Sequence, residues 1–345
     1  MASHLRTLLV GTTHVERGAL RVEAGVRIAI VLVLLLVPIV HFDAAKVGIP
    51  LAIGALFANL AEVGEDPGRR WRTMAWVTLW LMAMATLGSL LSEQAIAVVI
   101  ASAPVAFACG VAGAAGPRAA LGGVLSLVTF IIFAGAPSLP EAAIESGALV
   151  GLGGMAATVA IVVSTLVRDP RALVSALGDA PTMGQRFREH LAVRDAFVRH
   201  GVRIAVAIPI ATAIADASGF LHAYWLPMTI AWVTRPDLEG TVVKVLARVA
   251  GTLIGIAISA FLLLALGVHG YAAVLVVAIA GGVTVAFLLA NYAVAIVGIT
   301  TFVIAIFSIG GDPVSEDLIL RVGATIAGAL LAVAASFIGR VRPAD

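Results

Sequence analysis

The feature that most constrains this chain is a run of 63 residues, Val249–Gly311, that contains no Asp, Glu, Lys or Arg. A bilayer crossing takes roughly 20 mainly apolar residues, so this run is long enough for about three crossings. In lipid the backbone must satisfy its own hydrogen bonds, which leaves helices or a closed barrel. The apolar residues are continuous and do not alternate, so we expect α-helices.

The composition of the whole chain agrees with a membrane protein. Of its 345 residues, 61% are hydrophobic and 12% are charged, and the mean hydropathy is +1.08. Such a chain has too few polar side chains to cover a soluble globule, so the lipid bilayer is its expected environment. Its basic residues form no extended face, which argues against nucleic acid as a partner. A single cysteine, Cys109, excludes an intrachain disulfide and a multi-cysteine metal site.

Charges, Pro/Gly punctuation and run length predict about 12 transmembrane helices in an all-α integral membrane protein, arranged as two parallel six-helix repeats. We expect a cytoplasmic N-terminal segment at 1–24, a first repeat at 25–167, a cytoplasmic linker at 168–200 and a second repeat at 201–340. The predicted segments are 26–40, 46–62, 73–92, 95–115, 118–136, 143–166, 202–218, 221–235, 243–266, 270–289, 292–309 and 318–339.

The distribution of basic residues predicts the orientation. With twelve crossings, all but two of the 22 basic residues lie on the side of the central linker, and the exceptions are Lys46 and Arg321. Basic residues concentrate on the cytoplasmic side of membrane proteins. We therefore expect a multi-pass protein of the inner (plasma) membrane with both termini in the cytoplasm.

A short motif indicates an internal repeat. The sequence Gly-Val-Arg-Ile-Ala at Gly25–Ala29 recurs at Gly201–Ala205, and the spacing from position 25 to position 201 is called the repeat offset below. In parallel repeats the substrate path usually lies between the halves, so matched residues become candidates for that path. The alternative is that matched residues only preserve helix ends and packing. Further pairs at the repeat offset are Arg72 with Arg248, Gly135 with Gly311, Pro137 with Pro313 and Gly147 with Gly323.

Several basic residues are candidates for the substrate path. Lys244 and Arg248 are four residues apart, so both project from one face of a helix. Together with Arg72 they could form a basic cytoplasmic vestibule that collects organic anions. Alternatively, they contact lipid phosphates or the carboxylates of Asp237 and Glu239.

Three arginines lie near the ends of predicted helices, namely Arg27, Arg203 and Arg235. A long basic side chain in such a position can extend to the membrane surface, and this is the interpretation we favour for all three. Arg235 is also a candidate for the substrate path.

Arg321 is the only arginine on the predicted outer side. Its spacing from Asp317 favours a local ion pair. Its counterpart in the first repeat is Glu145, so Arg321 and Glu145 could instead face each other near an outer exit. Glu145 is therefore also a candidate for proton coupling.

Asp216 and His222 flank a predicted outer turn and are further candidates for proton coupling, because both can titrate. The alternative is that His222, Tyr224 and Trp225 belong to an aromatic belt at the membrane interface.

Other motifs indicate packing and not catalysis. Gly147–Gly151 and Gly251–Gly255 have the spacing that lets membrane helices approach closely. The chain has no paired carboxylates, no Gly-x-Ser-x-Gly, no Walker motif and no metal-spaced histidines. We therefore expect no enzyme activity, no catalytic residue, no metal and no cofactor.

The second half resembles the fusaric-acid-resistance-like integral membrane transporter domain, which occurs in aromatic acid exporters and is related to plant malate-activated anion channels. The first half matches less well, with Gly48-Ile49-Pro50-Leu51 in place of the Tyr-Trp motif, although Arg72 keeps the basic position. The resemblance is carried by Tyr224-Trp225-Leu226-Pro227-Met228-Thr229, Arg235-Pro236, Arg248–Gly255, Asn291-Tyr292-Ala293-Val294-Ala295, Thr300-Thr301 and Arg321–Gly328.

This resemblance implies export of aromatic or other organic acids through an inner membrane, driven by the proton gradient. Asn291 and Tyr292, which lie in one of the motifs, complete the substrate-path candidates. The expected partners are the lipid bilayer, a small organic anion as substrate, and either a second copy of the chain or a periplasmic adaptor subunit. An organic-anion channel and a non-transporting envelope scaffold are the alternative functions.

Overall fold

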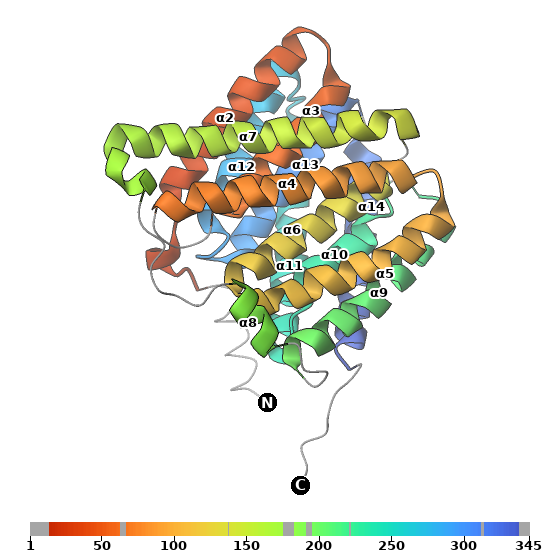
Figure 1. The fold of residues 1–345 in the computed structure, drawn as a ribbon. Coiled ribbons are helices and arrows are strands. Elements are labelled where there is room, and N and C mark those ends of the chain that lie inside the picture. Colours follow the sequence, from red (N-terminus) through yellow and green to blue (C-terminus); the bar gives the residue numbers. More distant parts are fainter. Residues whose placement is uncertain are drawn as a thin grey trace. The chain divides into compact units, whose positions relative to one another are not determined.

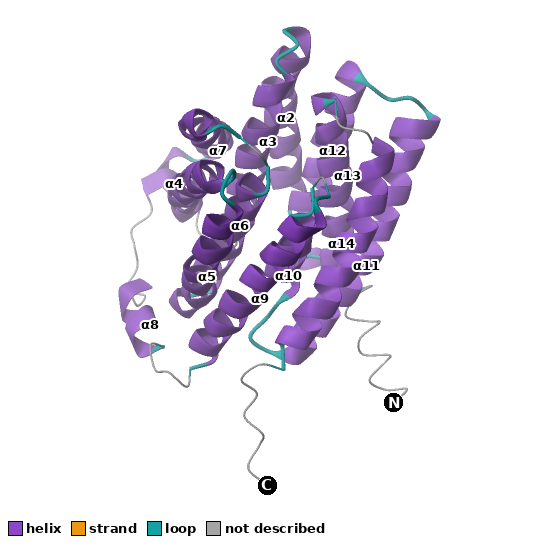
Figure 2. Ribbon diagram, turned by 90° about the vertical axis from the view of Figure 1, so that its right-hand side faces the viewer, coloured by secondary structure: helices purple, strands orange, loops and turns teal. Residues whose placement is uncertain are grey.

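The computed structural model describes residues 14–62, 67–136, 138–174, 183–190, 195–220, 222–311 and 314–337. For 67–68, 174, 183 and 316–317 it describes the backbone only. The secondary structure of the described residues is helical throughout, without strands, so the all-α prediction is confirmed (Figure 2). The predicted repeat pair Pro137 and Pro313 and the side chain of Asp317 lie outside the described residues.

Ten helices of the described chain are long and apolar enough to cross a membrane. The chain is therefore a multi-pass membrane protein. These helices are α2 (Val22–His41), α4 (Pro67–Leu91), α5 (Ala95–Val111), α6 (Pro117–Ala134), α7 (Ala143–Arg168), α9 (Ala196–Ser218), α11 (Leu238–Ser259), α12 (Gly270–Phe287), α13 (Tyr292–Gly310) and α14 (Val314–Ala335). A π-helical stretch, Ala260–Ala265, extends α11, and a short surface helix, α8 (Met183–Glu189), lies in the predicted linker.

The other two predicted segments, 46–62 and 221–235, form shorter helices. They are α3 (Ala45–Leu60), with 16 residues, and α10 (Trp225–Val233), with 9. At 1.5 Å per residue these helices are about 24 and 14 Å long, which is less than the roughly 30 Å of a bilayer core. Ten of the twelve predicted segments thus reach the length of a span and two do not.

The short helices are buried on all sides. All nine residues of α10 are buried, as are twelve of the sixteen in α3. A helix that is apolar all round belongs inside the protein, and these two are surrounded by other helices. The end of α10 follows from its sequence: Pro236 disfavours a helical conformation at the residue before it, and the chain is already extended at Thr234.

The described chain forms two compact units, and each combines helices from both predicted repeats. Unit 1 comprises residues 1–83, 144–176 and 246–322, and unit 2 comprises 84–143, 177–245 and 323–345. In unit 1, α3 packs against α2 and α13, and α12 packs against both α13 and α2, which closes a ring of four helices (Figure 1).

Unit 2 contains a ring with the same order of contacts. Here α10 packs against α9 and α6, and α5 packs against both α6 and α9. Each helix of this ring is separated by about one repeat offset from its counterpart in the ring of unit 1. The turns after α2 and α9 also agree, because Asp43 and Gly219 are a pair at the repeat offset and both have left-handed backbone (φ 53° and 64°).

Glycines allow the backbones of α3 and α7 to touch in unit 1. A Cβ atom at Gly54 would lie 2.0 Å from the carbonyl oxygen of Val150, and one at Gly153 would lie 2.0 Å from that of Leu51. Close approach of this kind stabilises membrane helices, because their association depends on van der Waals packing. The short helix of unit 1 is therefore held in place by glycine.

Two predicted glycine contacts are confirmed in unit 1. Gly251 and Gly255 of α11 lie against the backbone of α13, where added Cβ atoms would lie 2.5 Å from the Ala293 oxygen and 2.9 Å from the Val297 oxygen. Gly151 lies against Met82 of α4. In unit 2, Gly328 of α14 lies against the short helix α10, as Gly153 of α7 lies against the short helix α3 in unit 1.

Candidate functional site

The first candidate site lies between α11 and α13 in unit 1 and is centred on Arg248. This side chain is 1% exposed, and none of its guanidinium nitrogens forms a hydrogen bond of normal geometry within the described chain. The hydroxyl of Tyr292, the first residue of α13, is the polar group that interacts with it. Arg248 therefore has no acidic partner among the described residues.

Arg248 lies in the interior of its helix and not in its first turns. Arg248 is ten residues from Leu238, the start of α11, which corresponds to about 15 Å along the axis. A cation at such a depth costs about 2.5–3.5 kcal/mol on insertion scales, and such residues usually mark ion or substrate pathways. An anionic ligand would compensate this charge.

Two more polar groups lie further along the contact between α11 and α13, beyond Arg248. Buried hydroxyls elsewhere in unit 1, such as those of Ser259 and Thr284, donate to the carbonyl four residues earlier. The buried hydroxyls of Thr252 and Thr300 have no hydrogen-bond partner in the described chain. Thr252 is one turn after Arg248 on α11, and Thr300 lies opposite Gly255 on α13. Arg248, Thr252, Tyr292 and Thr300 are called the Arg248 site below.

The start of α13 is fixed next to this site. Asn291 caps the helix, because its Oδ1 accepts a hydrogen bond from the Val294 amide (3.0 Å). Its Nδ2 donates to the His14 carbonyl at 3.0 Å. The N-terminal end of a helix carries partial positive charge, so the start of α13 favours an anion near Tyr292. Asn291 positions this helix end.

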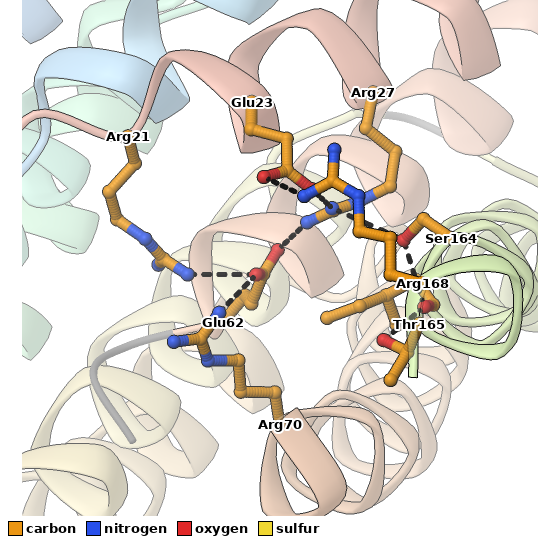
Figure 3. Close-up of polar contacts among 9 residues, drawn as sticks. Arg21, Glu23, Arg27, Glu62, Arg70, Ser164, Thr165 and Arg168 are labelled. Atoms are coloured by element: carbon orange, nitrogen blue, oxygen red, sulfur yellow. Dashed lines mark hydrogen bonds and ion pairs between the residues drawn. The ribbon is translucent and has the colours of Figure 1, made fainter. Parts of the chain in front are cut away.

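The second candidate site surrounds Glu62, which follows α3 in unit 1 and has a side chain only 2% exposed. Figure 3 shows guanidinium groups pointing at its carboxylate from three sides. Arg21 Nη2 donates to Oε1 at 2.8 Å, Arg27 Nη2 donates to Oε2, and Arg70 Nη1 lies 3.6 Å from Oε1. These four residues are called the Glu62 cluster below.

A second layer of contacts surrounds Arg27. Its Nη1 donates to the Ser164 hydroxyl at 3.5 Å, and the same atom lies 3.6 Å from Glu23. Glu23 also pairs with Arg168 at the end of α7, and both of these side chains are more than half exposed. The layer therefore links α2 and α7 at the edge of unit 1.

In unit 2, Arg203 holds the end of α10. It is the predicted repeat counterpart of Arg27, it is 6% exposed, and its Nη1 donates to the carbonyls of Arg235 (3.2 Å) and Pro236 (3.3 Å). Positive charge at a helix C-terminus is favourable, because unpaired carbonyls carry partial negative charge there. Both matched arginines therefore bind the chain that follows a short helix.

Arg27 and Arg203 have partners inside their units, and their extension to the membrane surface stays a prediction. Arg27 is 11% exposed and paired with Glu62, and Arg203 is bonded to two carbonyls inside unit 2. The sequence placed both near helix ends, but packing puts an acceptor next to each. Arg235 is half-buried, and its amide donates to the Thr241 hydroxyl.

The other basic candidates are placed as follows. Arg72 of α4 is half-buried, with its guanidinium 5.4 Å from the centre of the Trp71 ring. Lys244 is half-buried on α11 and belongs to unit 2, whereas Arg72 and Arg248 belong to unit 1. A common vestibule for these three residues stays a prediction.

Arg321 and Glu145 both belong to unit 1 but differ in exposure. Arg321 is 1% exposed, whereas Glu145, near the start of α7, is exposed. The predicted arrangement of the two stays a prediction.

Asp216 and His222 are separated by the turn between α9 and α10. Asp216 is exposed, whereas His222 is half-buried, stacks on Trp225 (5.1 Å) and lies 2.8 Å from the Tyr224 hydroxyl. Tyr224 and Trp225 are 6% and 1% exposed, so the alternative of a lipid-facing aromatic belt is wrong for both. The role of Asp216 and His222 in proton coupling stays a prediction.

Asp195 outside the spans forms a polar pair at the start of α9. Its Oδ1 accepts from the Phe197 amide as a helix cap, and its Oδ2 lies 2.9 Å from His190 Nδ1. The hydrogen bond from His190 is the main cause that lowers the pKa of the Asp195 carboxyl below its ordinary value; the Phe197 amide adds to this effect, and partial loss of hydration opposes it. This pair fixes where the helix begins after the linker.

Sequence reasoning missed Glu62 and Asn59, one turn apart at the end of α3. Asn59 is fully buried, and neither its Oδ1 nor its Nδ2 has a hydrogen-bond partner in the described chain. A signal was present, because both are strongly polar residues inside the predicted apolar segment 46–62. The three arginines around Glu62 could not be assigned to it, because they lie on two other helices.

Comparisons with known proteins agree with the resemblance. Residues 210–335 match a family model described as fusaric acid resistance protein-like. The inner membrane protein YccS of Escherichia coli (strain K12) is 32% identical over 151 residues, which cover 44% of this chain and 21% of YccS. The uncharacterized protein slr1298 of Synechocystis is 28% identical over 142 residues, or 41% of this chain and 18% of slr1298.

The chain matches only part of the length of these relatives. The uncharacterized protein ORF2 of Neisseria gonorrhoeae is 28% identical over 88 residues, which cover 26% of this chain and 21% of ORF2. The chain thus matches about a fifth of the length of each of these three proteins. No solved structure matches it. The motifs from Tyr224 to Gly328 lie within the matched range, so the resemblance is confirmed there.

Proposed function

Residues 210–335 belong to the fusaric acid resistance protein-like family, and from this premise we propose that the chain is a secondary transporter that exports aromatic or other organic acids across the inner membrane. The multi-pass helical structure supports transport. In this proposal the protein performs no chemical step, both termini face the cytoplasm, and transport is coupled to protons. A second copy of the chain or a periplasmic adaptor subunit would complete the assembly.

The observation that carries the proposal is the buried charge of Arg248. A guanidinium that is 1% exposed and lacks an acidic partner in the described chain costs free energy unless an anion binds it. The planar guanidinium suits a carboxylate, because two parallel N–H groups can donate to its two oxygens. The hydroxyls of Thr252, Tyr292 and Thr300 would hold the remaining polar atoms of such a substrate.

The short helices support transport independently. In transporters, a pair of unusually short hydrophobic segments at corresponding positions of two repeats is a pointer to the substrate-binding region. α3 and α10 are such a pair, because both are short and buried and both follow the first helix of their predicted repeat.

We further infer that the chain contains a duplicated six-helix unit. The ring of α2, α3, α13 and α12 in unit 1 has the same contact order as the ring of α9, α10, α6 and α5 in unit 2. Arg27 and Arg203 each bind the segment that follows the short helix of their ring, Arg27 through the Glu62 carboxylate and Arg203 through backbone carbonyls. Each ring combines two helices of one half with two of the other, so both halves are needed to form either unit.

Flux of labelled aromatic carboxylates into proteoliposomes, with and without a pH gradient, tests the proposed function. We expect flux that depends on the pH gradient. Flux without any response to that gradient would favour an anion channel, and the absence of flux for every carboxylate would contradict transport.

Arg248→Gln tests the site itself. Hydrogen bonds to a charged group contribute about 1.5–3 kcal/mol, so we expect a KM about 10- to 150-fold higher. Arg72→Gln is the matched control, because Arg72 is the repeat counterpart but is half-buried beside Trp71. An equal loss of flux in both variants would argue against a special role for Arg248.

A further inference from the structure

We propose that Arg21, Arg27 and Arg70 form a second anion-binding site, for carboxylate ligands, which Glu62 occupies in this structure as a tethered counter-anion. A ligand carboxylate would exchange with the Glu62 carboxylate on the same arginines. This inference rests on the proposed transport of organic anions and concerns how such an anion is received before it reaches the Arg248 site.

The geometry of the Glu62 cluster is that of a bound carboxylate. Both of its oxygens are used, since Oε1 accepts from Arg21 and Oε2 accepts from Arg27. The arginines come from α2, from the residue before it and from α4, whereas Glu62 lies in the irregular segment after α3. The cationic groups are therefore held on helices or at a helix start, while the anion is carried by a connecting segment.

The four side chains of the Glu62 cluster differ in how much of their surface is exposed. The side chain of Glu62 is 2% exposed, and those of Arg27, Arg21 and Arg70 are 11%, 17% and 33% exposed. The carboxylate is thus the innermost group, and the arginines lie between it and the surface. An anion that approaches from outside unit 1 meets guanidinium groups first. Arg27 Nε is buried and has no acceptor in the described chain, so it can serve an additional oxygen.

The second half of the chain shows that the fold does not require these charges. At the repeat offset, Arg21, Glu62 and Arg70 correspond to Phe197, Leu238 and Leu246. Arg27 alone is retained, as Arg203, which is bonded to backbone carbonyls. The ring of unit 2 forms with Phe197 and Leu238 at the positions of Arg21 and Glu62, whereas Leu246 belongs to unit 1.

The charges also have no clear advantage for stability. Apolar residues at buried positions are often as stabilising as an ion pair, because the pair must lose its hydration. Leu238, the counterpart of Glu62 at the repeat offset, is half-buried and uncharged, and this contrast supports a role of the charged cluster in binding.

Equilibrium binding of labelled benzoate to the purified full chain in nanodiscs tests the proposal. Glu62→Gln removes the internal competitor but keeps the shape of the side chain, so we expect benzoate to bind at least tenfold more tightly. Adding Arg27→Gln should abolish this gain. Glu23→Gln is the matched control: it removes a carboxylate beside Arg27, but one that is 54% exposed, and should change the affinity less than twofold.

Several results would overturn the proposal. These are an unchanged or weaker affinity in Glu62→Gln, an equal gain in Glu23→Gln, or a gain for inorganic phosphate without one for benzoate. If Glu62→Gln does not fold, Glu62→Asp replaces it. The shorter side chain cannot reach Arg21 and Arg27 together, so we expect at least a threefold gain, and no gain would refute the proposal.

A double variant separates this inference from the proposed function. In an Arg248→Gln background, the gain from Glu62→Gln should persist, because the second site uses other arginines. Loss of transport in Arg248→Gln together with no gain in Glu62→Gln would leave the transporter standing and refute the second site. Tighter benzoate binding in Glu62→Gln, in a protein that shows no flux of any carboxylate, would support the second site and contradict the proposed transport.

Discussion

Replacing Arg248 by methionine should make the protein more stable and at the same time inactive. Methionine fills a similar volume but carries no charge. The substitution removes the cost of a buried cation, about 2.5–3.5 kcal/mol, and loses the interaction with Tyr292, which is worth about 1 kcal/mol. The free energy of unfolding should therefore rise by about 2 kcal/mol. Gains in stability at the cost of activity are typical of binding sites.

Arg203→Met is the matched control for this prediction. Arg203 is also buried, but it donates to the carbonyls of Arg235 and Pro236, and both of these hydrogen bonds would be lost, although the Arg235 carbonyl would keep the Thr241 hydroxyl at 3.5 Å. Two such hydrogen bonds contribute about 3–6 kcal/mol, which exceeds the cost of burying the cation. From the midpoints of these two ranges we expect the free energy of unfolding to fall by about 1.5 kcal/mol. Replacing Arg248 should thus raise the free energy of unfolding, whereas replacing Arg203 should lower it.

Reversible unfolding in mixed micelles, followed by tryptophan fluorescence, measures both variants, and flux of a labelled carboxylate in proteoliposomes measures their activity. A fall of more than about 1 kcal/mol in Arg248→Met would refute the reasoning, because it would show that Arg248 has a structural partner. Full transport by Arg248→Met would refute its role in binding.

Three further predictions concern stability. Gly153→Ala should lower the free energy of unfolding by about 3 kcal/mol in thermal or denaturant unfolding, because its Cβ would lie 2.0 Å from the Leu51 oxygen. Gly323→Ala, with no atom within 4 Å, should raise it by up to about 1 kcal/mol, and equal effects would contradict this. Asn291→Ala removes the cap of α13 and should cost about 1 kcal/mol in the same assay, whereas no loss would show the cap to be dispensable. The pKa of Asp195 is lowered in the folded protein, so its contribution to the free energy of unfolding is complete above about pH 4 and is lost as the pH falls through the native pKa. When unfolding is measured between pH 3 and 7, the free energy of unfolding of Asp195→Asn should therefore depend less on pH than that of the unchanged protein.

Sequence reasoning predicted those features that depend on one segment at a time. Ten predicted segments are helices of spanning length, and Gly251 and Gly255 form the expected close contact. It predicted α3 and α10 as spans, because hydropathy alone does not separate a short buried helix from a spanning one. Their shortness became clear only from the helix ends and from the neighbours that bury them.

In the candidate sites, too, the sequence indicated single residues, whereas their partners depended on the packing of the helices. Arg248 and Tyr292 were both candidates from the sequence, but their proximity depends on how α11 packs on α13. The pairing of Arg21 and Arg27 with Glu62 joins positions 41 and 35 residues apart. No local pattern marks such a pairing, which is why Arg27 was assigned to the membrane surface.

The sequence by itself determined that this chain is a helical membrane protein, where most of its helices lie, and that residues 210–335 match the model of a known family. These properties follow from hydropathy and motifs, which are local to each segment. The tertiary structure decided which charges are neutralised. Glu62 lies among arginines and Arg248 lies without an acid in the described chain, because partners are chosen by the packing of helices that are distant in the sequence.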